Sequence, residues 1–469
     1  MVDNSAWRKV QDLGMFRLSS LLLLAVLALV FARDKGIAVT GDNISGQLGL
    51  SDTNDRNLPV MVDNSAWYPE EPEMVCGGYG HTVVLTNKGS VYVMGENVYG
   101  QLGLGDNYSR YAPTLISQDS FDGNKIKTIA CGDDHTILID SKEQVWGFGK
   151  NDNYELGQGE GNKAHANKPI TISFPSIMSG KPERAFAYGY TTYILTTKGQ
   201  VWAFGMDDYG QTGCGSAAQT VIMTPTTLDM SQLPDTIPNT SKIVDLAPGG
   251  KHCLAIMDTG DVVAFGFNSH GQLGVGKSMD EMLYSPAPLK VTSGWGYLKP
   301  VSVSAGYWHS VVRVETGTLY CFGANANYEC GNVYAGDRIL VPVTMDLTNL
   351  ENEKVTGVSC GDYFTVMIDA SHRVFACGDG SQGQLGSGNM DEQQIPQQMD
   401  MRLVPGDKFK SIVAATSWTM LVLGVPAMSN SVLIWGMVIC AVVFLGVLGF
   451  IFYPSFSRSG KKGFSAYIG

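Results

Sequence analysis

Residues 76–103, CGGYGHTVVLTNKGSVYVMGENVYGQLG, decide the fold. They contain two apolar runs, His81 to Leu85 and Val91 to Met94, in which β-branched residues are frequent. A turn at Asn87 to Gly89 separates the runs, and this arrangement is typical of a β-hairpin. A Gly-x-Asn-x-x-Gly-Gln-Leu-Gly pattern begins directly after the second run. The stretch therefore predicts two antiparallel strands followed by a glycine-rich loop.

The glycine-rich pattern recurs along the chain. It is complete at Gly41 to Gly49, Gly95 to Gly103 and Gly266 to Gly274, and weaker copies begin at Gly149, Gly205, Gly323 and Gly378. Successive copies begin 54, 54, 56, 61, 57 and 55 residues apart. A repeat of this length cannot bury both of its faces alone, so the copies must pack on one another. They predict an all-β fold, a seven-bladed β-propeller over residues 34–423.

A second pattern, Cys-Gly-x-x-His-Thr, precedes the hairpin in phase with the first. Its glycine falls at Gly78, Gly132, Gly189, Gly249, Gly306 and Gly361, with Thr416 in the seventh place. The next glycine-rich pattern begins 17 residues later in every case but the third, where it begins 16 residues later. Thr192, Phe364 and Thr419 are expected to replace the histidine in repeats three, six and seven.

The paired patterns resemble repeats of the regulator of chromosome condensation family, over roughly Asp34 to Leu423. The resemblance is specific, because WD-repeat blades are shorter and end in Trp-Asp, and kelch blades carry a Gly-Gly pair elsewhere. It implies a propeller that binds proteins. In exchange factors of that family, residues at the Gly-x-x-His turn face the bound GTPase.

The seventh hairpin is divided between the two ends of the chain. Its first strand is expected at Thr419 to Leu423, and no ordinary hairpin follows it. Lys35, Gly36 and Ile37 to Thr40 read like the missing turn and second strand. We therefore predict that N- and C-terminal strands pair to close the ring. Leu433 to Gly436 competes weakly for the same position, because an apolar run continues beyond it.

Two apolar runs flank the propeller. Residues 432–453 are free of charge and would extend about 33 Å as a helix, enough to cross a hydrocarbon core of roughly 30 Å. We expect a linker at 424–431, a transmembrane helix at 432–453 and a basic tail at 454–469. The run at 18–32 fits equally a cleaved signal peptide and a short N-terminal membrane anchor within residues 1–33.

The flanking charges predict the orientation in the membrane. Basic residues precede the first run and follow the second, and such flanks favour the cytosol. We expect a single-pass protein, or a two-pass protein if residues 18–32 are retained, with a lumenal or extracellular propeller and a cytosolic tail. Asn43, Asn107 and Asn239 begin N-x-Ser/Thr triplets and become informative if they are glycosylated. The heptapeptide MVDNSAW occurs at 1–7 and again at 61–67 and carries no functional inference.

Composition excludes some partners. The net charge is −12 and no basic stripe is present, so we expect no nucleic-acid partner. Nine cysteines in a chain of 469 residues do not form a dense disulfide framework. Cys131 and Cys360 occupy equivalent repeat positions and are expected to be buried, inert thiols.

The sequence predicts no enzyme, no cofactor and no metal site. The histidines of the second pattern lie one per blade and cannot converge on one ion, so we expect a structural role in which they bond the turn backbone. The adjacent carboxylates Asp207 and Asp208, or Asp133 and Asp134, are expected to point apart. The glycine-rich turns lack the Lys-Ser or Lys-Thr of a phosphate-binding loop.

Candidate binding residues lie in the Gly-x-x-His turns. These turns are at the opposite strand end from the hairpin turns, so they should form a ring on the face away from the membrane. Aromatic residues and a few charges on a loop face are typical of protein-binding hot spots. The candidates are Tyr79, Asp133, Asp134, Tyr190, Lys251, Tyr307, Trp308, Asp362, Tyr363 and Trp418. The alternative is that several of these side chains only cover the core.

Two functions remain open at this point. The first is a membrane-tethered propeller that binds a protein of unknown identity through the ring of turns. The second follows from the family resemblance, a guanine-nucleotide exchange factor for a small GTPase. The second function requires a cytosolic propeller, against the bias of the flanking charges.

Overall fold

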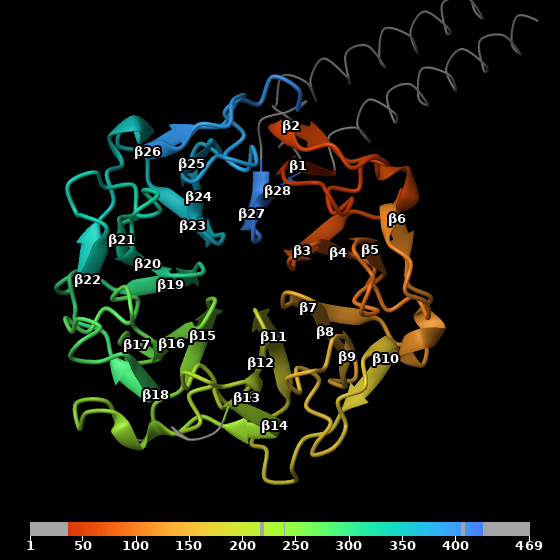
Figure 1. Cartoon of the computed structure of the whole chain (residues 1–469), viewed down its shortest axis with the longest axis horizontal. Helices are drawn as coiled ribbons and strands as arrows, with labels where there is room; N and C mark the ends of the chain where they lie inside the picture. Colours follow the sequence, from red (N-terminus) through yellow and green to blue (C-terminus); the bar gives the residue numbers. More distant parts are fainter. Residues whose placement is uncertain (1–35, 216–219, 239, 405–408, 425–469) are drawn as a thin grey trace, which may run out of the picture. The chain divides into compact units, whose positions relative to one another are not determined.

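The computed structural model describes residues 36–215, 220–238, 240–404 and 409–424. These residues form seven antiparallel four-stranded sheets around a central axis (Figure 1). The strand nearest the axis in each sheet is β3 (Pro72–Gly77), β7 (Ile126–Cys131), β11 (Pro182–Tyr188), β15 (Ile243–Pro248), β19 (Pro300–Ala305), β23 (Val355–Cys360) or β27 (Phe409–Ala414). This arrangement confirms the seven-bladed all-β propeller.

The predicted hairpins are the second and third strands of the blades. They are β4 (His81–Thr86) and β5 (Val91–Gly95), β8 (His135–Asp140) and β9 (Val145–Gly149), β12 (Thr191–Thr196) and β13 (Val201–Met206), β16 (His252–Met257) and β17 (Val262–Phe267), β20 (His309–Val314) and β21 (Leu319–Ala324), and β24 (Phe364–Asp369) and β25 (Val374–Gly378). These strands are largely buried, because neighbouring blades cover both of their faces.

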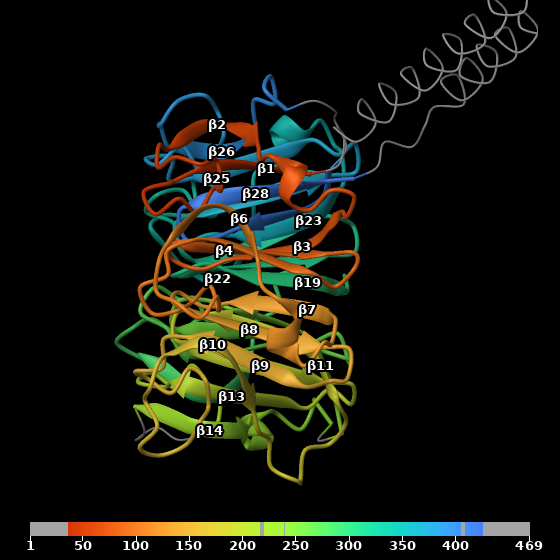
Figure 2. The same cartoon turned by 90° about the vertical axis from the view of Figure 1, so that its right-hand side faces the viewer.

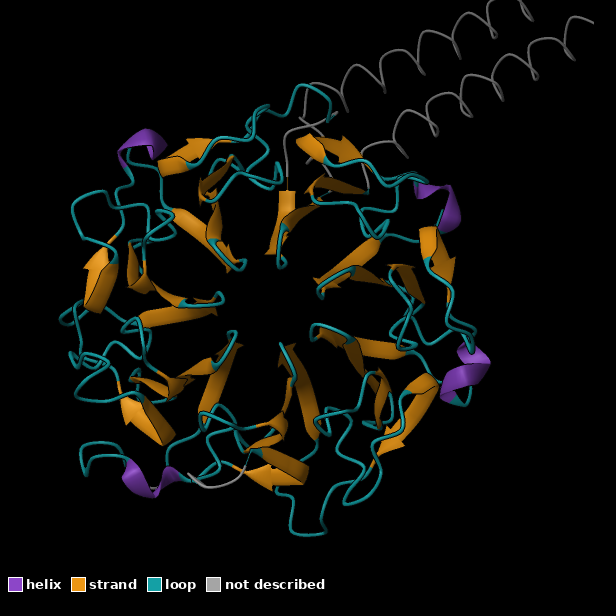
Figure 3. Cartoon of the chain, viewed as in Figure 1, coloured by secondary structure: helices purple, strands orange, loops and turns teal. Residues whose placement is uncertain are grey.

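The fourth strands form the outer edge of the ring and are more exposed. They are β6 (Arg110–Leu115), β10 (Ala166–Ile172), β14 (Val221–Thr227), β18 (Tyr284–Lys290), β22 (Arg338–Thr344), β26 (Gln393–Gln398) and β2 (Arg56–Met61). Short 3-10 helices lie at the periphery (Figure 3), namely η1 (Asn64–Ala66), η2 (Gln118–Phe121), η3 (Met230–Gln232) and η4 (Thr348–Leu350).

The seventh blade joins the two ends of the described chain. Strand β1 (Ile37–Gly41) pairs antiparallel with β28 (Trp418–Leu423), with Ile37 opposite Val422 and Gly41 opposite Trp418. The Leu423 N–H also donates to the Gly36 carbonyl at 3.0 Å. The predicted closure of the ring by N- and C-terminal strands is therefore confirmed.

The hydrophobic core lies between the blades, and this position explains the last glycine of the glycine-rich pattern. Gly103 has a φ of +66°, and a Cβ built on it would lie 2.9 Å from the Phe148 ring of the next blade. Gly213 has the same relation to Phe265, at 2.8 Å. These rings are fully buried, so the loop needs a residue without a side chain at this point.

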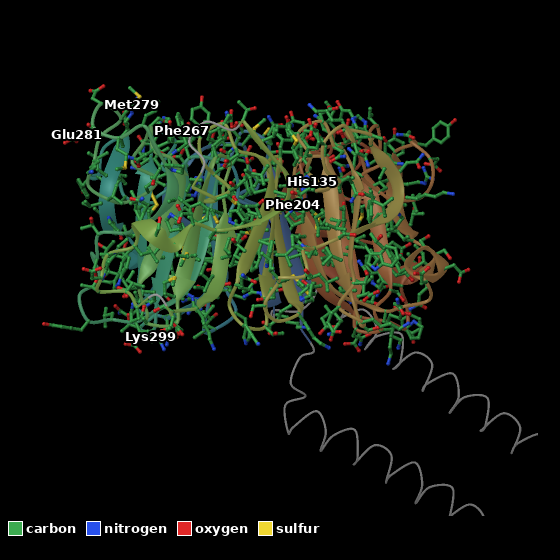
Figure 4. All side chains as sticks on the ribbon, turned by 90° about the horizontal axis from the view of Figure 1, so that it is seen from below. His135, Phe204, Phe267, Met279, Glu281 and Lys299 are labelled. Carbon is green, nitrogen blue, oxygen red and sulfur yellow. A yellow bond between two sulfur atoms is a disulfide. The ribbon has the colours of Figure 1, made fainter. Side chains whose placement is uncertain are left out.

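The strand connections divide between two faces, which Figures 2 and 4 show from the side. The motif face carries the turns from first to second strand and the glycine-rich loops from third to fourth strand. Met279 and Glu281 lie on it in Figure 4. The hairpin face carries the hairpin turns and the connections between blades, and includes Lys299. Gly36 and Gly424, at the ends of the described ranges, also belong to the hairpin face, because β1 begins there and β28 ends there.

The predicted membrane segments, 18–32 and 432–453, lie outside the described residues, as do the basic tail and the predicted linker apart from Gly424. Within the part of the chain that the structure describes, no helix is long and apolar enough to cross a membrane. The membrane anchor therefore stays a prediction from the sequence.

Candidate functional site on the motif face

In two blades, the residue at the histidine position of the turn pattern lies one residue earlier in the chain than the sequence predicted. The patterned histidine pairs with the first glycine of the glycine-rich loop, as His135 does with Gly149. In the third blade Thr191 holds this position, opposite Gly205, and in the seventh blade Trp418 holds it, opposite Gly41. The assignments of Thr192 and Thr419 to this position were therefore wrong. The 16-residue spacing in the third repeat is the sequence signal of the shift.

The histidines of the turn pattern form hydrogen bonds between their own blade and the next one. His135 Nε2 lies 2.8 Å from the Thr192 hydroxyl, and this hydroxyl donates to the Glu155 carbonyl at 2.9 Å. Because the hydroxyl proton goes to the carbonyl, Nε2 must carry the donated proton and Nδ1 must be bare. Burial lowers the pKa of His135 to about 3. The role is structural, but the bond goes to a hydroxyl and not to the turn backbone.

The same relay occurs at three further junctions. In each, a histidine bonds to a hydroxyl of the next blade, and that hydroxyl donates to a carbonyl of the histidine's own blade. In the order histidine, hydroxyl and carbonyl, the three relays are His81, Thr136 and Gln101; His252, Ser310 and Gln272; and His309, Thr365 and Glu329. The relays explain why His-Thr recurs as a pair in the sequence.

Neighbouring turns of the motif face are bonded to one another around the axis. The Tyr79 N–H donates to the Asp133 carbonyl at 2.8 Å, and the Asp133 N–H donates to the Gly189 carbonyl at 2.8 Å. Further around, the Asp362 N–H donates to the Thr416 carbonyl at 3.1 Å. These backbone contacts hold the turns of the ring in fixed relative positions.

This close approach explains the glycine of the turn pattern. A Cβ at Gly78 would lie 2.3 Å from the Gly132 carbonyl oxygen, and one at Gly306 would lie 2.3 Å from the Gly361 carbonyl oxygen. Such contacts are closer than any real Cβ makes, so a side chain would force the turns apart.

The ten candidate residues fall into two groups. Tyr79 is 63% exposed and Tyr363 is 37% exposed. Half-buried positions are held by Asp133, Tyr190, Lys251, Tyr307, Trp308 and Asp362. Asp134 is buried beside Lys150, and Trp418 is fully buried inside the seventh blade. Eight candidates therefore contribute to the surface, whereas Asp134 and Trp418 do not. Trp418 is buried because it occupies the histidine position and not the turn.

Two carboxylates face the axis at the motif face. Tyr188, which the sequence did not single out, crosses from the third blade and donates its hydroxyl proton to Asp362 of the sixth blade. Burial and the charge of Asp362 raise the pKa of Asp133 to about 7, and burial raises the pKa of Asp362 to about 6. Asp133 and Tyr188 also line one end of a cavity of about 280 Å³, whose walls are the innermost strands. We call Asp133 and Asp362 the axial carboxylates.

Five rings form an aromatic row across four blades of the motif face. Centroid distances along the row are 4.2 Å from Tyr209 to Phe267, 5.4 Å from Phe267 to Trp308, 4.5 Å from Trp308 to Tyr307 and 6.1 Å from Tyr307 to Tyr363. Phe267 lies near the motif surface in Figure 4. Burial, the charge of Asp133, the neighbouring Tyr363 and the charge of Asp362 raise the pKa of Tyr307 to about 12. The row therefore ends close to the axial carboxylates.

Two lysines of the motif face are held by aromatic rings and carboxylates of the protein itself. The Lys150 ammonium lies 4.5 Å from the Tyr99 centroid, 4.8 Å from the Tyr190 centroid and 3.1 Å from the Asp134 carboxylate. The Lys251 ammonium lies 4.5 Å from the Tyr209 centroid and 3.4 Å from the Asp208 carboxylate. Cation–π contacts of this kind are attractive because the ring face is negative.

Among the described cysteines, two pairs are bonded. Cys76 and Cys131, 55 residues apart, join the innermost strands of the first two blades, and Cys321 joins Cys330 within the fifth repeat. The expectation of an inert thiol at Cys131 was therefore wrong. Cys360 is a buried free thiol, and burial raises its pKa to about 12. No group of three or more His, Cys, Asp or Glu within the described ranges could hold a metal ion.

The three glycosylation triplets differ in exposure. Asn43 is fully buried, and its side-chain amide donates to the Asp52 carbonyl at 3.0 Å. Asn107 is exposed on a motif-face loop. Asn239 lies outside the described residues. Of the two described triplets, only the one at Asn107 has an exposed asparagine, and its side-chain amide donates to the Val98 carbonyl at 2.8 Å.

The interlocked blades, with one ring of aromatic and charged turns, define a seven-bladed repeat propeller suited to binding proteins. Models of the Regulator of chromosome condensation (RCC1) repeat match residues 88–139, 198–256, 259–313, 316–368 and 371–422. A second model of the same repeat matches 126–155, 243–272, 301–329 and 355–384. The chain therefore belongs to the regulator of chromosome condensation family.

The chain is similar in sequence to two relatives, of which it covers different shares. The Ultraviolet-B receptor UVR8 of Arabidopsis thaliana is 28% identical over 369 residues, which are 78% of this chain and 78% of the receptor. The Serine/threonine-protein kinase Nek9 of Xenopus laevis is 26% identical over 326 residues, which are 66% of this chain but 33% of the kinase. The likeness to the kinase thus concerns a third of that protein.

Solved structures confirm the fold. Human WBSCR16 superposes with a TM-score of 0.72 at 19% identity, over 83% of this chain and 98% of the other. Yeast RCC1 (Prp20), solved in complex with Kap60, gives 0.72 at 19% identity, over 83% and 89%. At this identity the likeness is one of architecture.

Proposed function

We propose that the chain is a membrane-tethered propeller that binds a protein partner through its motif face. The observation that carries the proposal is the separation of the two faces. Both described chain ends belong to the hairpin face, and each is continuous in sequence with an apolar run, 18–32 or 432–453. The aromatic row and the exposed turn residues all belong to the opposite face, which a tether would leave free.

The proposal places the propeller in the lumen or outside the cell. The Cys76–Cys131 bond between blades supports this location, because disulfides persist in oxidising compartments. The exposed Asn107 triplet is compatible with it. The basic residues beyond both apolar runs support the same orientation.

We expect the propeller to be protected from protease in sealed microsomes that contain the full chain. Digestion should remove the tail at 454–469 and, if residues 18–32 are retained as an anchor, the residues before them, and detergent should then expose the propeller. Asn107→Gln should remove a glycan-dependent shift in gel mobility. Complete digestion of the propeller in intact vesicles, with no glycan on the chain, would contradict the lumenal location.

Partner capture tests the motif face directly. We expect Trp308→Ala combined with Tyr363→Ala to reduce capture of membrane-derived partners at least tenfold, because both side chains are partly exposed in the aromatic row. The measurement is affinity capture followed by quantification of the co-purifying proteins. Tyr297→Ala is the matched control, since Tyr297 is a fully exposed aromatic residue of the hairpin face. Equal loss in both variants would contradict a specific motif-face interface.

A guanine-nucleotide exchange factor is the second candidate. The structure of yeast Prp20p was solved with a study of its binding to Gsp1p and histones, and its TM-score with this chain is 0.72. The candidate requires a cytosolic propeller, so the protease experiment separates the two functions. An exposed propeller that accelerates nucleotide release from a small GTPase would favour exchange activity.

A further inference from the structure

We propose that the motif face binds an arginine side chain of its partner at the Tyr363 end of the aromatic row, beside the axial carboxylates. The inference rests on the proposed function and names the chemistry of the partner. It is carried by a contrast between two parts of the same face.

The first part of the face is already occupied by cations. Lys150 is held by Tyr99, Tyr190 and Asp134. Lys251 is held by Tyr209 and Asp208, at the other end of the aromatic row. In both places an ammonium lies over a ring and pairs with a carboxylate. The face thus combines rings and acids in a geometry that binds a cation.

The second part has the same ingredients without a cation. Tyr307, Trp308 and Tyr363 are in mutual ring contact, and Asp362 precedes Tyr363 in the same turn. Within the described ranges, no Lys or Arg lies over these three rings or forms an ion pair with Asp133 or Asp362. Asp362 accepts a hydrogen bond from the Tyr188 hydroxyl, which leaves lone pairs on its carboxylate for a second donor.

The electrostatics of the axial carboxylates point to the same missing group. Each carboxylate is poorly hydrated, and the charge of Asp362 acts on Asp133, so the pKa of Asp133 is raised to about 7. Lys150 opposes this shift only partly, because its own ion pair is with Asp134. A second cation between the axial carboxylates and the row would relieve the repulsion.

Arginine fits this position better than lysine. Its guanidinium is planar, so it can stack on the exposed part of Tyr363 while its N–H groups bond a carboxylate. It is also less strongly hydrated than an ammonium, which suits a half-buried site. His270 already stacks on Trp308 at 5.4 Å, so Tyr363, at the free end of the row, is the ring that we expect the guanidinium to contact.

The test uses the full chain in detergent micelles and a nona-arginine peptide, with binding measured by fluorescence anisotropy of the labelled peptide. Nona-citrulline is the probe control, because it keeps the shape and removes the charge. We expect Tyr363→Ala and Asp362→Asn each to weaken nona-arginine binding at least tenfold, and nona-citrulline not to bind. Tyr334→Ala is the matched control, since Tyr334 is 92% exposed on a motif-face loop. Circular dichroism verifies that each variant is folded.

Each outcome has a distinct meaning. Equal binding of nona-arginine to Tyr363→Ala, Tyr334→Ala and the parent chain overturns the inference, because the peptide is then attracted only by the net negative charge of the protein. Absence of binding to the folded parent chain overturns it as well. In both cases the proposed function stands if partner capture still depends on Trp308 and Tyr363, and it fails if capture does not.

Discussion

Trp418→Ala is expected to lower the free energy of unfolding by about 3–5 kcal/mol, the range found when a buried large aromatic side chain is truncated. Trp418 is fully buried, and its backbone lies opposite Gly41 at the junction of the two chain ends. Its ring reaches the first blade, where a Cβ on Gly77 would lie 2.7 Å from it. The truncation would therefore open a cavity where the last blade meets the first. Chemical denaturation of the full chain in detergent, followed by near-ultraviolet circular dichroism, measures the loss.

Two further variants interpret this result. Trp308→Ala should be less destabilising than Trp418→Ala, because the Trp308 ring is partly exposed and its truncation opens no enclosed cavity. Trp418→His should be less destabilising than Trp418→Ala, because Thr82 already donates to the Gln47 carbonyl at 2.7 Å and would complete the relay seen at four other junctions. Equal stability of Trp418→Ala and the parent chain would show that the closing blade contributes little to the cohesion of the ring.

The sequence was sufficient for the fold because the constraints that build a blade are local and repeated. A hairpin of fixed length gives a fixed spacing, and spacing also identified Ile37 to Thr40 as the missing partner of the last blade. The pattern failed where the turn kept its length but its glycine moved by one position. In the third repeat, Tyr188 holds the position that Gly132 holds in the second repeat, and the glycine follows at Gly189. An alignment that matches Gly189 to Gly132 therefore places the rest of the third turn one residue too late.

The site was less predictable, because it is assembled from segments that only the closed ring brings together. The turn residues Tyr307 and Tyr363 could be predicted from their position beside a patterned glycine. Tyr209 and Phe267 could not, because they belong to the strand ends and loops that follow the hairpin. Their contact with the turns crosses from one blade to the next. The Cys76–Cys131 bond could have been predicted from the sequence, because the two cysteines occupy equivalent positions of consecutive repeats and such positions are neighbours in a ring.

Asp133→Asn is expected to stabilise the propeller at pH 8 by up to about 4 kcal/mol and to have little effect at pH 4. In the folded chain the pKa of Asp133 is raised to about 7 from 3.8. As the pH rises from 4 to 7, the unfolded chain therefore loses this proton before the folded chain does, and the free energy of unfolding falls. Asparagine has no proton to lose, so the variant avoids this fall. Urea denaturation of both chains at pH 4, 6 and 8 gives the difference.

Comparing the variant with the parent chain separates the effect of Asp133 on the pH dependence of stability from the effect of the buried histidines. Those histidines have lowered pKa values, so they reduce stability as the pH falls below about 6.5, and they do so equally in both chains. Asp134→Asn is the matched control and should destabilise the chain across this range, because it breaks the 3.1 Å ion pair with Lys150. A pH-independent gain in Asp133→Asn would refute the raised pKa of Asp133 in the folded chain. Greater stability of Asp133→Asn at high pH together with weaker nona-arginine binding would show that the charge of Asp133 reduces the stability of the free protein and contributes to binding a cation of the partner.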